Sequence, residues 1–445
     1  MQNRLFTRGL IVLIIIAGLI GASWLITRAR SISAPLDAAQ DYFAETVHRA
    51  GAATDRLIDT LQTRLKSAPN DQAAYSQLGL AYLQKARETG DPTLYQKAGG
   101  VLNKALELQS DDYVAVSASG ALALARHQFA EALHRGEQAR QINPDRTYAY
   151  GVIGDAQIEL GRYDEAVATL QTMVDLRPDL SSYSRISYLR ELYGDMSGAV
   201  DLMQRAVDGG GPQPENSAWT RTQLGNLHFN TGDLKNAEIE YQRTLNGLPN
   251  YVYALAGLGR VRFAQGRTDE AIALLTQATQ AMPLPEFVIA LGDIYQATGK
   301  VQIAQQHYQL VGAIQQLYEA NGVDLDLEIA LFNADHDRDL AKTVEQARAG
   351  YARRPGIYAA DVLAWALYKA GETEEARQYS NEALRLGTRD ALKYFHAGLI
   401  ARQLGDTTQA KQFLAEALSL NPHFSILYAA DAQAALSELN KIAVK

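Results

Sequence analysis

Hydrophobic residues recur with the period of an α-helix through most of this chain, and the helical stretches come in pairs separated by a glycine. The stretch from Ala149 to Pro178, AYGVIGDAQIELGRYDEAVATLQTMVDLRP, is typical. On each side of Gly161 the apolar positions repeat every three or four residues, which places them on one face of a helix. The pattern predicts two antiparallel helices joined by a tight turn at this glycine.

The phrase Gly-x4-Ala marks this turn and recurs at a nearly constant interval. Successive glycines are 33, 38, 34, 33, 72 and 34 residues apart. The interval of 38 contains an extra loop at residues 209–216, and the interval of 72 holds one divergent unit, in which we expect the turn at His336 and the alanine at Ala341. Upstream, His127 replaces the glycine. The spacings predict ten units of about 34 residues each. The pairs that match the phrase are Gly161/Ala166, Gly194/Ala199, Gly232/Ala237, Gly266/Ala271, Gly299/Ala304, Gly371/Ala376 and Gly405/Ala410.

The glycine, the alanine and a closing proline have different physical roles in each unit. Glycine adopts the left-handed conformation that ends the first helix, because it has no Cβ atom to clash. Alanine lets the two helix backbones approach closely where they cross. Proline, as at Pro178, ends the second helix. The unit is therefore built from turn geometry and packing, with no reactive side chain.

These residues resemble the tetratricopeptide repeat. Leu78-Gly79 with Tyr82, and Leu258-Gly259, fit positions of its first helix, and small residues fit its second helix at Ala105, Ala139, Ala206, Ala278, Ala383 and Ala417. The resemblance covers roughly residues 71–422 and implies an all-α superhelical solenoid of about ten helix-turn-helix repeats. Residues 54–68 read as a half-unit and residues 425–439 as a terminal capping helix with a polar outer face. The stretches at residues 78–95, 333–339 and 382–401 also resemble an uncharacterised group of bacterial, membrane-anchored repeat proteins.

The first segment is predicted to be a membrane anchor. Gly9 to Thr27 is a run of 19 residues without a charge, beginning Gly9-Leu10 and including Trp24. As a helix it is about 28 Å long, enough to cross the hydrocarbon core. A cleaved signal peptide is the alternative, but the apolar run continues through Trp24, beyond the usual length of such a segment. We expect an uncleaved single-pass anchor with the repeat body outside the cytoplasm.

This reading divides the chain into four parts. Residues 1–30 are the anchor, residues 31–70 a helical linker with the half-repeat, residues 71–424 the repeat array, and residues 425–445 the capping helix.

Charge and composition exclude several classes of function. The net charge is −8, and residues 1–30 carry four Arg and no acid, so the remainder carries −8 − 4 = −12. A solenoid that binds nucleic acid would instead present Lys and Arg to phosphates, so we expect no nucleic-acid partner. The absence of Cys removes disulfides, thiolate metal sites and a Cys nucleophile.

No motif along the chain predicts catalysis, a cofactor or a metal. The sequence DHDRD spaces three Asp residues as a calcium loop does, but Leu340 and Gln346 stand where that loop needs Gly and a bidentate Glu. The Gly299-Lys300 pair lacks the earlier glycine of a phosphate-binding loop. We therefore expect no catalytic residue, no cofactor and no metal, and an enzyme would need scattered residues that converge in the groove.

The inner face, lined by the first helix of each unit, is the candidate site. Rigid aromatic rings there would give a peptide contact area, while polar groups would fix its register. Asn226 can hydrogen-bond a ligand backbone and Arg260 can hold a carboxylate. The Lys positions that accompany such residues in chaperone-binding repeats are Thr222 and Ala256, which argues against a chaperone tail. The candidates are Tyr188, Trp219, Asn226, Phe229, Tyr253, Arg260, Phe263, Trp365 and Tyr368, and single rings among them could instead pack between units.

The sequence thus predicts a non-catalytic scaffold that presents a concave groove to protein or peptide partners near a membrane. An extracytoplasmic binder of small molecules or glycans would use the same aromatic groove. An enzyme with scattered groove residues is the remaining alternative.

Overall fold

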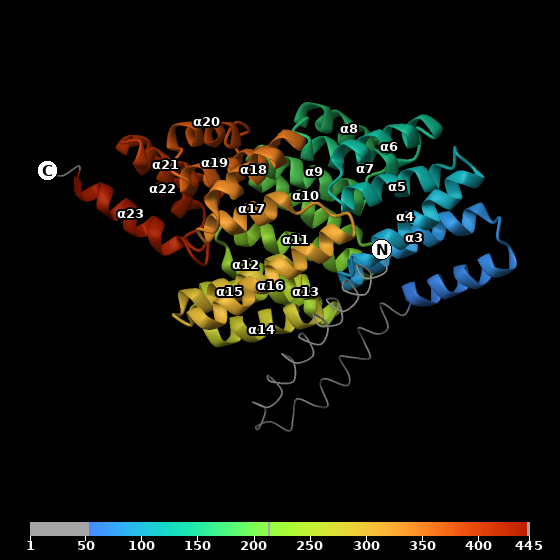
Figure 1. Ribbon diagram of the computed structural model, residues 1–445, viewed down its shortest axis with the longest axis horizontal. Coiled ribbons are helices and arrows are strands. Elements are labelled where there is room, and N and C mark those ends of the chain that lie inside the picture. The colour runs from blue at the N-terminus through green and yellow to red at the C-terminus, as the bar shows by residue number, and fades with distance from the viewer. Residues whose placement is uncertain (1–52, 212–213, 443–445) are drawn as a thin grey trace, which may run out of the picture. The chain divides into compact units, whose positions relative to one another are not determined.

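The structure is a computed structural model that describes residues 53–211 and 214–442. Between α3 and α22 these residues form ten consecutive antiparallel helix pairs, preceded by a helix over residues 53–67 and followed by α23 (Ala429–Ile442) (Figure 1). The described residues contain α-helices and no strand, as the repeat pattern predicted. The pairs are α3 (Gln72–Thr89) with α4 (Thr93–Leu108), α5 (Tyr113–Ala125) with α6 (Phe129–Ile142), α7 (Thr147–Glu159) with α8 (Tyr163–Leu176), α9 (Leu180–Leu192) with α10 (Met196–Gly209), α11 (Pro214–Asn230) with α12 (Leu234–Gly247), α13 (Val252–Ala264) with α14 (Thr268–Ala281), α15 (Pro285–Ala297) with α16 (Val301–Ala320), α17 (Asp326–Asp335) with α18 (Leu340–Arg353), α19 (Ile357–Lys369) with α20 (Thr373–Ala383), and α21 (Ala391–Gln403) with α22 (Thr407–Leu420).

The repeated glycine and alanine have the roles that their spacing predicted. Gly161 and Gly194 have φ angles of +71° and +76°, and His127, which replaces glycine in the second pair, has a φ of +57°. The alanines are fully buried where the helices of a pair cross. Their small side chain lets the two helices pack closely at that point. They are Ala132, Ala166, Ala199, Ala237, Ala271, Ala304, Ala376 and Ala410.

An aspartate directly after the turn glycine caps the second helix in three pairs. The carboxylates of Asp195, Asp233 and Asp406 accept hydrogen bonds of 2.9, 3.1 and 2.9 Å from the backbone N–H three residues on. Such a cap satisfies a backbone donor that the helix leaves free and contributes about 1 kcal/mol. The Gly-Asp step therefore both ends one helix and begins the next.

In the divergent eighth pair the predicted register was wrong. His336 has a φ of −110° and ends α17, while the left-handed residues are Asp337 and Asp339. The second left-handed residue lengthens the turn, so Thr343 takes the buried crossing position and Ala341 is exposed.

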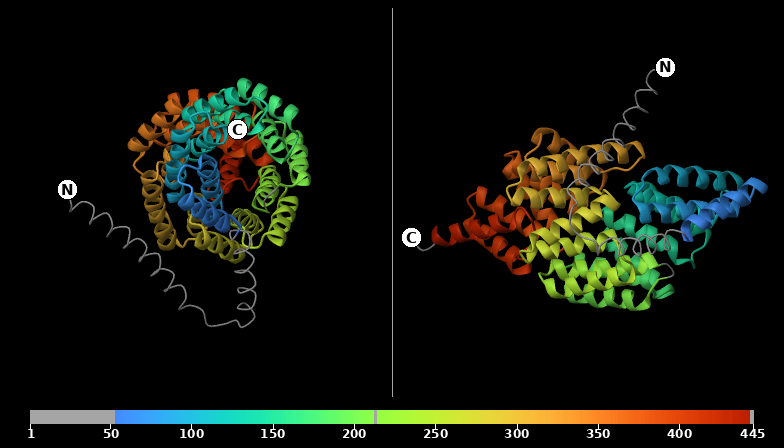
Figure 2. Two further views of the ribbon diagram at one scale, coloured as in Figure 1. Left: turned by 90° about the vertical axis from the view of Figure 1, so that its right-hand side faces the viewer. Right: turned by 90° about the horizontal axis from the view of Figure 1, so that it is seen from below.

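The pairs wind into a superhelix whose second turn lies directly on the first (Figure 2). Hydrogen bonds join residues between 192 and 197 positions apart, which is between five and six repeats. The Ile357 N–H donates to the Tyr163 hydroxyl at 2.8 Å, and the Asn421 amide donates to the Phe229 carbonyl at 2.8 Å. His127 Nδ1 lies 2.6 Å from the Asp324 carbonyl oxygen. Contacts between turns therefore close the side of the superhelix around an inner space, which we call the lumen.

The predicted membrane segment at residues 9–27 lies outside the described residues. Among the helices of residues 53–211 and 214–442, none combines the length and the apolar character needed to cross a bilayer. At the other end, α23 begins a few residues later than expected, and its exposed Gln433, Ser437 and Glu438 form the polar outer face that the sequence predicted for the last helix.

Candidate functional site

The lumen holds two adjoining cavities. The larger, about 1110 Å³, is lined mainly by the helix over residues 53–67 and by α3, α5, α7, α9, α11 and α13, and we call it the N-terminal chamber. The smaller, about 610 Å³, lies between the two superhelical turns and is called the inter-turn chamber. Asp155, Tyr188 and Arg260 line both chambers, so the two form one continuous space.

Four successive units contribute one residue each from the same position to this space. Asp155, Tyr188, Asn226 and Arg260 each stand six residues before the turn glycine of their unit. All four line the N-terminal chamber. The repeat therefore presents a ladder of differing side chains, one per first helix, along the inner face.

Asn226 is held with its amide group oriented. Its Oδ1 accepts a hydrogen bond of 2.7 Å from the Tyr241 hydroxyl, and its Nδ2 donates to Gln223 at 3.1 Å. An amide nitrogen carries two N–H groups, so one donor is left for a ligand. The arrangement suits a backbone carbonyl of a bound chain.

Arg260 makes no ion pair and no hydrogen bond with the described part of the chain. Its guanidinium lies 4.2 Å from the centre of the Phe229 ring, and burial lowers its pKa. Enclosing an uncompensated charge costs free energy unless a partner arrives. Arg260 is therefore the clearest anion-binding group of the ladder.

The neighbouring arginine on the inner face is fully paired. Arg185 forms two parallel hydrogen bonds of 2.8 Å with Asp155. Gly151 leaves room for this guanidinium, since a Cβ atom there would lie 3.1 Å from its central carbon. Arg185 and Asp155 thus form a closed pair that stiffens the chamber wall and leaves Arg260 as the open cation of the ladder.

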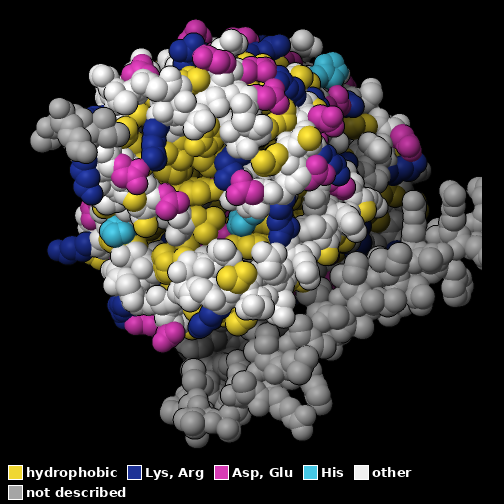
Figure 3. Space-filling view, turned by 60° about the vertical axis from the view of Figure 1, so that its left-hand side comes forward, with side chains coloured by type: hydrophobic (Ala, Val, Ile, Leu, Met, Phe, Trp, Pro, Cys, Tyr) yellow, Lys and Arg dark blue, Asp and Glu magenta, His cyan; other side chains and the backbone are white. Residues whose placement is uncertain are grey.

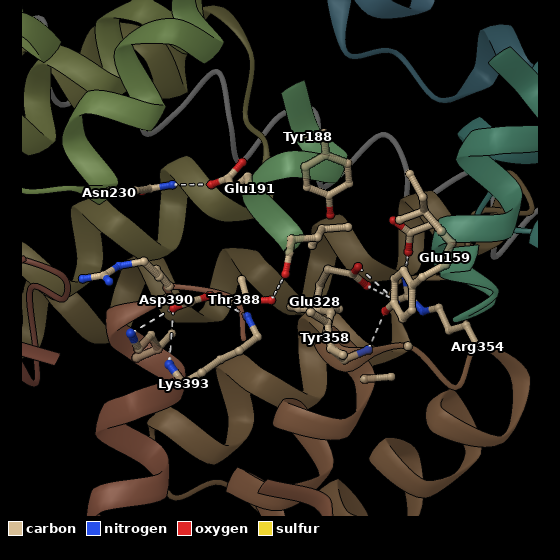
Figure 4. A pocket seen from close by; sticks show the side chains of 18 of the residues that line it. Glu159, Tyr188, Glu191, Asn230, Glu328, Arg354, Tyr358, Thr388, Asp390 and Lys393 are labelled. Atoms are coloured by element: carbon tan, nitrogen blue, oxygen red, sulfur yellow. Dashed lines mark hydrogen bonds and ion pairs between the residues drawn. The ribbon is translucent and has the colours of Figure 1, made fainter. Parts of the chain in front are cut away.

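In the inter-turn chamber a single arginine serves two carboxylates. Arg354 Nη2 donates to both oxygens of Glu328 at 3.0 and 3.1 Å, while its Nη1 lies 3.7 Å from Glu159 (Figure 4). Glu159 ends α7 in the first superhelical turn, and Glu328 and Arg354 belong to the second. The Arg354 guanidinium also lies over the rings of Phe129 and Tyr358. This contact links the turns and leaves one negative charge in excess.

Glu159 has an unusual environment for a carboxylate. Burial raises its pKa to about 7, with Arg354 opposing the shift and Glu328 and Asp155 adding to it. Among the described residues it accepts no hydrogen bond, and its remaining 32% exposure is to the chamber that it lines.

We expect Glu159→Gln to stabilise the protein above neutral pH and to have little effect in acid. The folded-state pKa lies above the ordinary value of 4.5, so ionisation of Glu159 opposes folding as pH rises towards 7. Gln has no such charge, so the gain in melting temperature over wild type should grow between pH 4.5 and 7 and then level off. Melting curves at pH 5 and pH 8 check this, and an equal gain at both values would contradict it.

A second acid, Glu191, also faces the chamber without an ion pair. Its carboxylate accepts one hydrogen bond of 3.2 Å from Asn230, and burial raises its pKa. Lys393, across the chamber, instead pairs with Asp390, the N-cap of α21. The Lys393 ammonium is thus already occupied by a neighbour on its own helix end.

The structure brings together only part of the predicted site. Tyr188, Trp219, Asn226 and Arg260 line the chambers. Tyr253, Phe263 and Tyr368 are partly buried in aromatic and aliphatic clusters and line neither chamber.

Two predicted site residues are core residues instead. Phe229 and Trp365 are buried, the first against Tyr251 and Tyr241 and the second against Phe395. The Phe229 ring is 2% exposed and lies beneath the Arg260 guanidinium, and the Trp365 ring is 1% exposed, so neither offers a surface to a ligand.

Sequence reasoning missed the acids and the cation of the inter-turn chamber. Glu159 and Glu191 stand at or next to the C-terminal ends of α7 and α9, where the helix dipole disfavours a carboxylate. A carboxylate in this unfavourable position is a feature of the sequence that could have indicated a functional role. The contact of Arg354 with Glu159 gave no signal, because the two residues are 195 positions apart in the chain (354 − 159) and meet only between superhelical turns.

The described residues contain no cluster of three or more His, Asp or Glu side chains with the geometry of a metal site. The charged groups of the lumen are arranged as pairs and single open charges. This arrangement suits recognition of a charged ligand.

A further surface feature lies on the side of the body that carries α23. Figure 3 shows hydrophobic side chains gathered in a hollow on this side, with Lys, Arg, Asp and Glu side chains around them.

Comparison with known proteins gives one consistent family. Models described as tetratricopeptide repeat match residues 123–190, 222–285, 357–378 and 394–424. The chain is 24% identical over 208 residues to anaphase-promoting complex subunit 7 of Arabidopsis thaliana, covering 46% of this chain and 37% of that protein. It is 26% identical over 321 residues to cellulose synthase 1 operon protein C of Komagataeibacter xylinus, covering 68% of this chain and 22% of that protein. The chain thus spans well under half the length of either relative.

Solved structures with a similar fold include human IFIT1 and yeast Tom70. The IFIT1 structure has a TM-score of 0.47 at 15% identity, covering 74% of this chain and 77% of that one. The Tom70 structure has a TM-score of 0.37 at 14% identity, covering 90% of this chain and 96% of that one.

Proposed function

Because this chain belongs to the tetratricopeptide repeat family, we propose that it is a non-catalytic scaffold whose lumen binds an extended segment of a partner protein. The observation that carries the proposal is the ladder at Tyr188, Asn226 and Arg260, with an oriented amide donor beside an unpaired guanidinium. The amide suits a backbone carbonyl and the guanidinium a carboxylate of the bound segment.

The closed side of the lumen determines what kind of partner fits. Hydrogen bonds such as the one from the Ile357 N–H to the Tyr163 hydroxyl join the two superhelical turns side by side. A folded domain cannot enter a space of about 1110 Å³, whereas an extended chain can run along the ladder. An extended segment also exposes its backbone groups, which the ladder can contact.

The place of action that we propose is a membrane surface. The apolar run at residues 9–27 would anchor the chain by one span, with the repeat body outside the cytoplasm. The protein would then hold its partner close to that membrane.

Photo-crosslinking in native membranes tests this function. A photoreactive amino acid replaces Trp219, whose side chain is 39% exposed and lines the N-terminal chamber. We expect crosslinks to a partner protein, and we expect them to map to one short segment of it whose sequence does not predict helix. Arg260→Gln should reduce the yield at least about tenfold if the guanidinium is a hot spot of binding.

The matched control carries the same photoreactive group at Val167, which is similarly exposed on α8 and lines neither chamber. Crosslinks from Val167 with none from Trp219 would place the partner on the outer face and refute binding in the lumen.

A further inference from the structure

Two tyrosines from different superhelical turns present their rings to the inter-turn chamber. Tyr188 on α9 is 43% exposed and Tyr358 on α19 is 36% exposed, and both line that chamber. Figure 4 shows Glu159 among the residues that line the chamber together with both rings. Burial raises the pKa of each tyrosine, and the Glu159 carboxylate adds to both shifts. The acid and the two rings therefore share one enclosed environment.

The carboxylates in this environment outnumber the cations that serve them. Arg354 is divided between Glu159 and Glu328, and it makes hydrogen bonds only to Glu328. Glu191 has a hydrogen bond from Asn230 and no ion pair among the described residues. Both Glu159 and Glu191 lie close enough to Tyr188 to raise its pKa. Within the described chain, Glu191 therefore has no ion pair and Glu159 has only a share of one, and Arg260, which also lines this chamber, pairs with neither glutamate.

We propose that a lysine or arginine side chain of the bound segment occupies the inter-turn chamber, between the rings of Tyr188 and Tyr358, with its cation on Glu159 and Glu191. This subsite rests on the proposed function and names the chemistry that the ligand must carry there. It is distinct from the Asn226 and Arg260 positions of the ladder, which suit a carbonyl and an anion.

A basic side chain fits each element of the subsite. The face of a tyrosine ring attracts a cation, and the methylene groups of Lys or Arg pack against aromatic carbon. A hydrogen bond between two charged groups is stronger than one between neutral groups. Lys393 of the other superhelical turn attracts Glu191 only at longer range, because its ammonium is paired with Asp390, so Glu191 keeps its carboxylate available to a ligand cation.

Selection from a displayed library of random 12-residue peptides on the full-length protein tests the subsite. We expect selected peptides to share one basic position, and replacing that residue with norleucine should weaken binding at least about tenfold. The variant Glu159→Gln/Glu191→Gln keeps the shape of both side chains and should remove the basic preference while still selecting peptides. Melting curves of the variant report whether it folds.

The control for general charge attraction is Glu107→Gln/Glu374→Gln. It removes the same charge from two exposed acids that line neither chamber, and it should keep the basic preference. Selected peptides with no shared basic position, or a preference that the lumen variant retains, would overturn the subsite and leave the scaffold function intact. Failure to select any peptide would overturn both.

Discussion

Replacing Gly194 with Ala is expected to destabilise the protein far more than replacing Gly405 with Ala. Both glycines end a first helix with a positive φ, +76° and +80°, so both variants place an L-residue in the left-handed region at a cost of about 1–2 kcal/mol. At Gly194 the new Cβ would also lie 2.4 Å from the Gly387 carbonyl oxygen, whereas nothing lies within 4 Å of it at Gly405. The backbone at Gly387 must then move, which adds about 1–3 kcal/mol.

Thermal melting followed by circular dichroism measures the difference between the two variants. Small-angle X-ray scattering measures the second expected result, which is that Gly194→Ala expands the body as the two turns separate, while Gly405→Ala leaves its radius unchanged. If both variants melt alike and keep the wild-type radius, the superhelical turns do not touch in solution, and the closed lumen is wrong.

The same contrast runs along the whole chain. A Cβ atom at Gly161 would lie 2.4 Å from the Pro355 carbonyl oxygen, while Gly266, Gly299 and Gly371 have open space around theirs. Gly161 and Gly194 therefore face the second superhelical turn. Gly266, Gly299 and Gly371 face no neighbouring backbone in the described part of the chain. A left-handed residue is therefore needed at the turns, and His127 and Asp337 show that it need not be glycine, whereas close approach to the other superhelical turn requires glycine at positions such as Gly161 and Gly194.

The sequence predicts the units well because each unit is a local structure. The turn at Gly161, the buried Ala166 and the pairing of adjacent helices all depend on residues less than one repeat apart. The predicted register of the eighth unit was wrong because its turn contains a second left-handed residue, Asp339. A fixed repeat spacing cannot predict this longer turn.

The winding of the superhelix cannot be predicted from local sequence patterns. Small rotations between successive units accumulate over 192 to 197 residues before Tyr163 meets Ile357 or Phe229 meets Asn421. The pairing of Glu159 with Arg354 follows from that winding, so no local pattern could have placed the two in one chamber. The ladder was partly predictable, because its residues share one position in the repeat.

Two of the three tryptophans, Trp219 and Trp365, lie in different environments, one on a chamber wall and the other in the core. Trp365 and Trp219 were both predicted to line the groove, yet Trp365 is 1% exposed and Trp219 faces the N-terminal chamber. Trp365 stacks on His396 with ring centres 4.1 Å apart, and its indole N–H donates to Asp335 at 2.8 Å. Burial already raises the pKa of Asp335, so removal of the indole would leave a buried carboxyl without this donor.

We therefore expect Trp365→Ala to lower the free energy of unfolding by about 3–5 kcal/mol and Trp219→Ala to change it by less than about 1 kcal/mol. Because a solenoid can unfold in parts, hydrogen exchange should show the loss of protection concentrated in α17, α19 and α21. Binding should follow the opposite order, with partner crosslinking from a photoreactive group at Tyr188 weakened by Trp219→Ala and retained by folded Trp365→Phe. Equal destabilisation by the two alanine variants would mean that Trp219 packs in the core as Trp365 does, and the wall of the N-terminal chamber would then lack its largest aromatic contact.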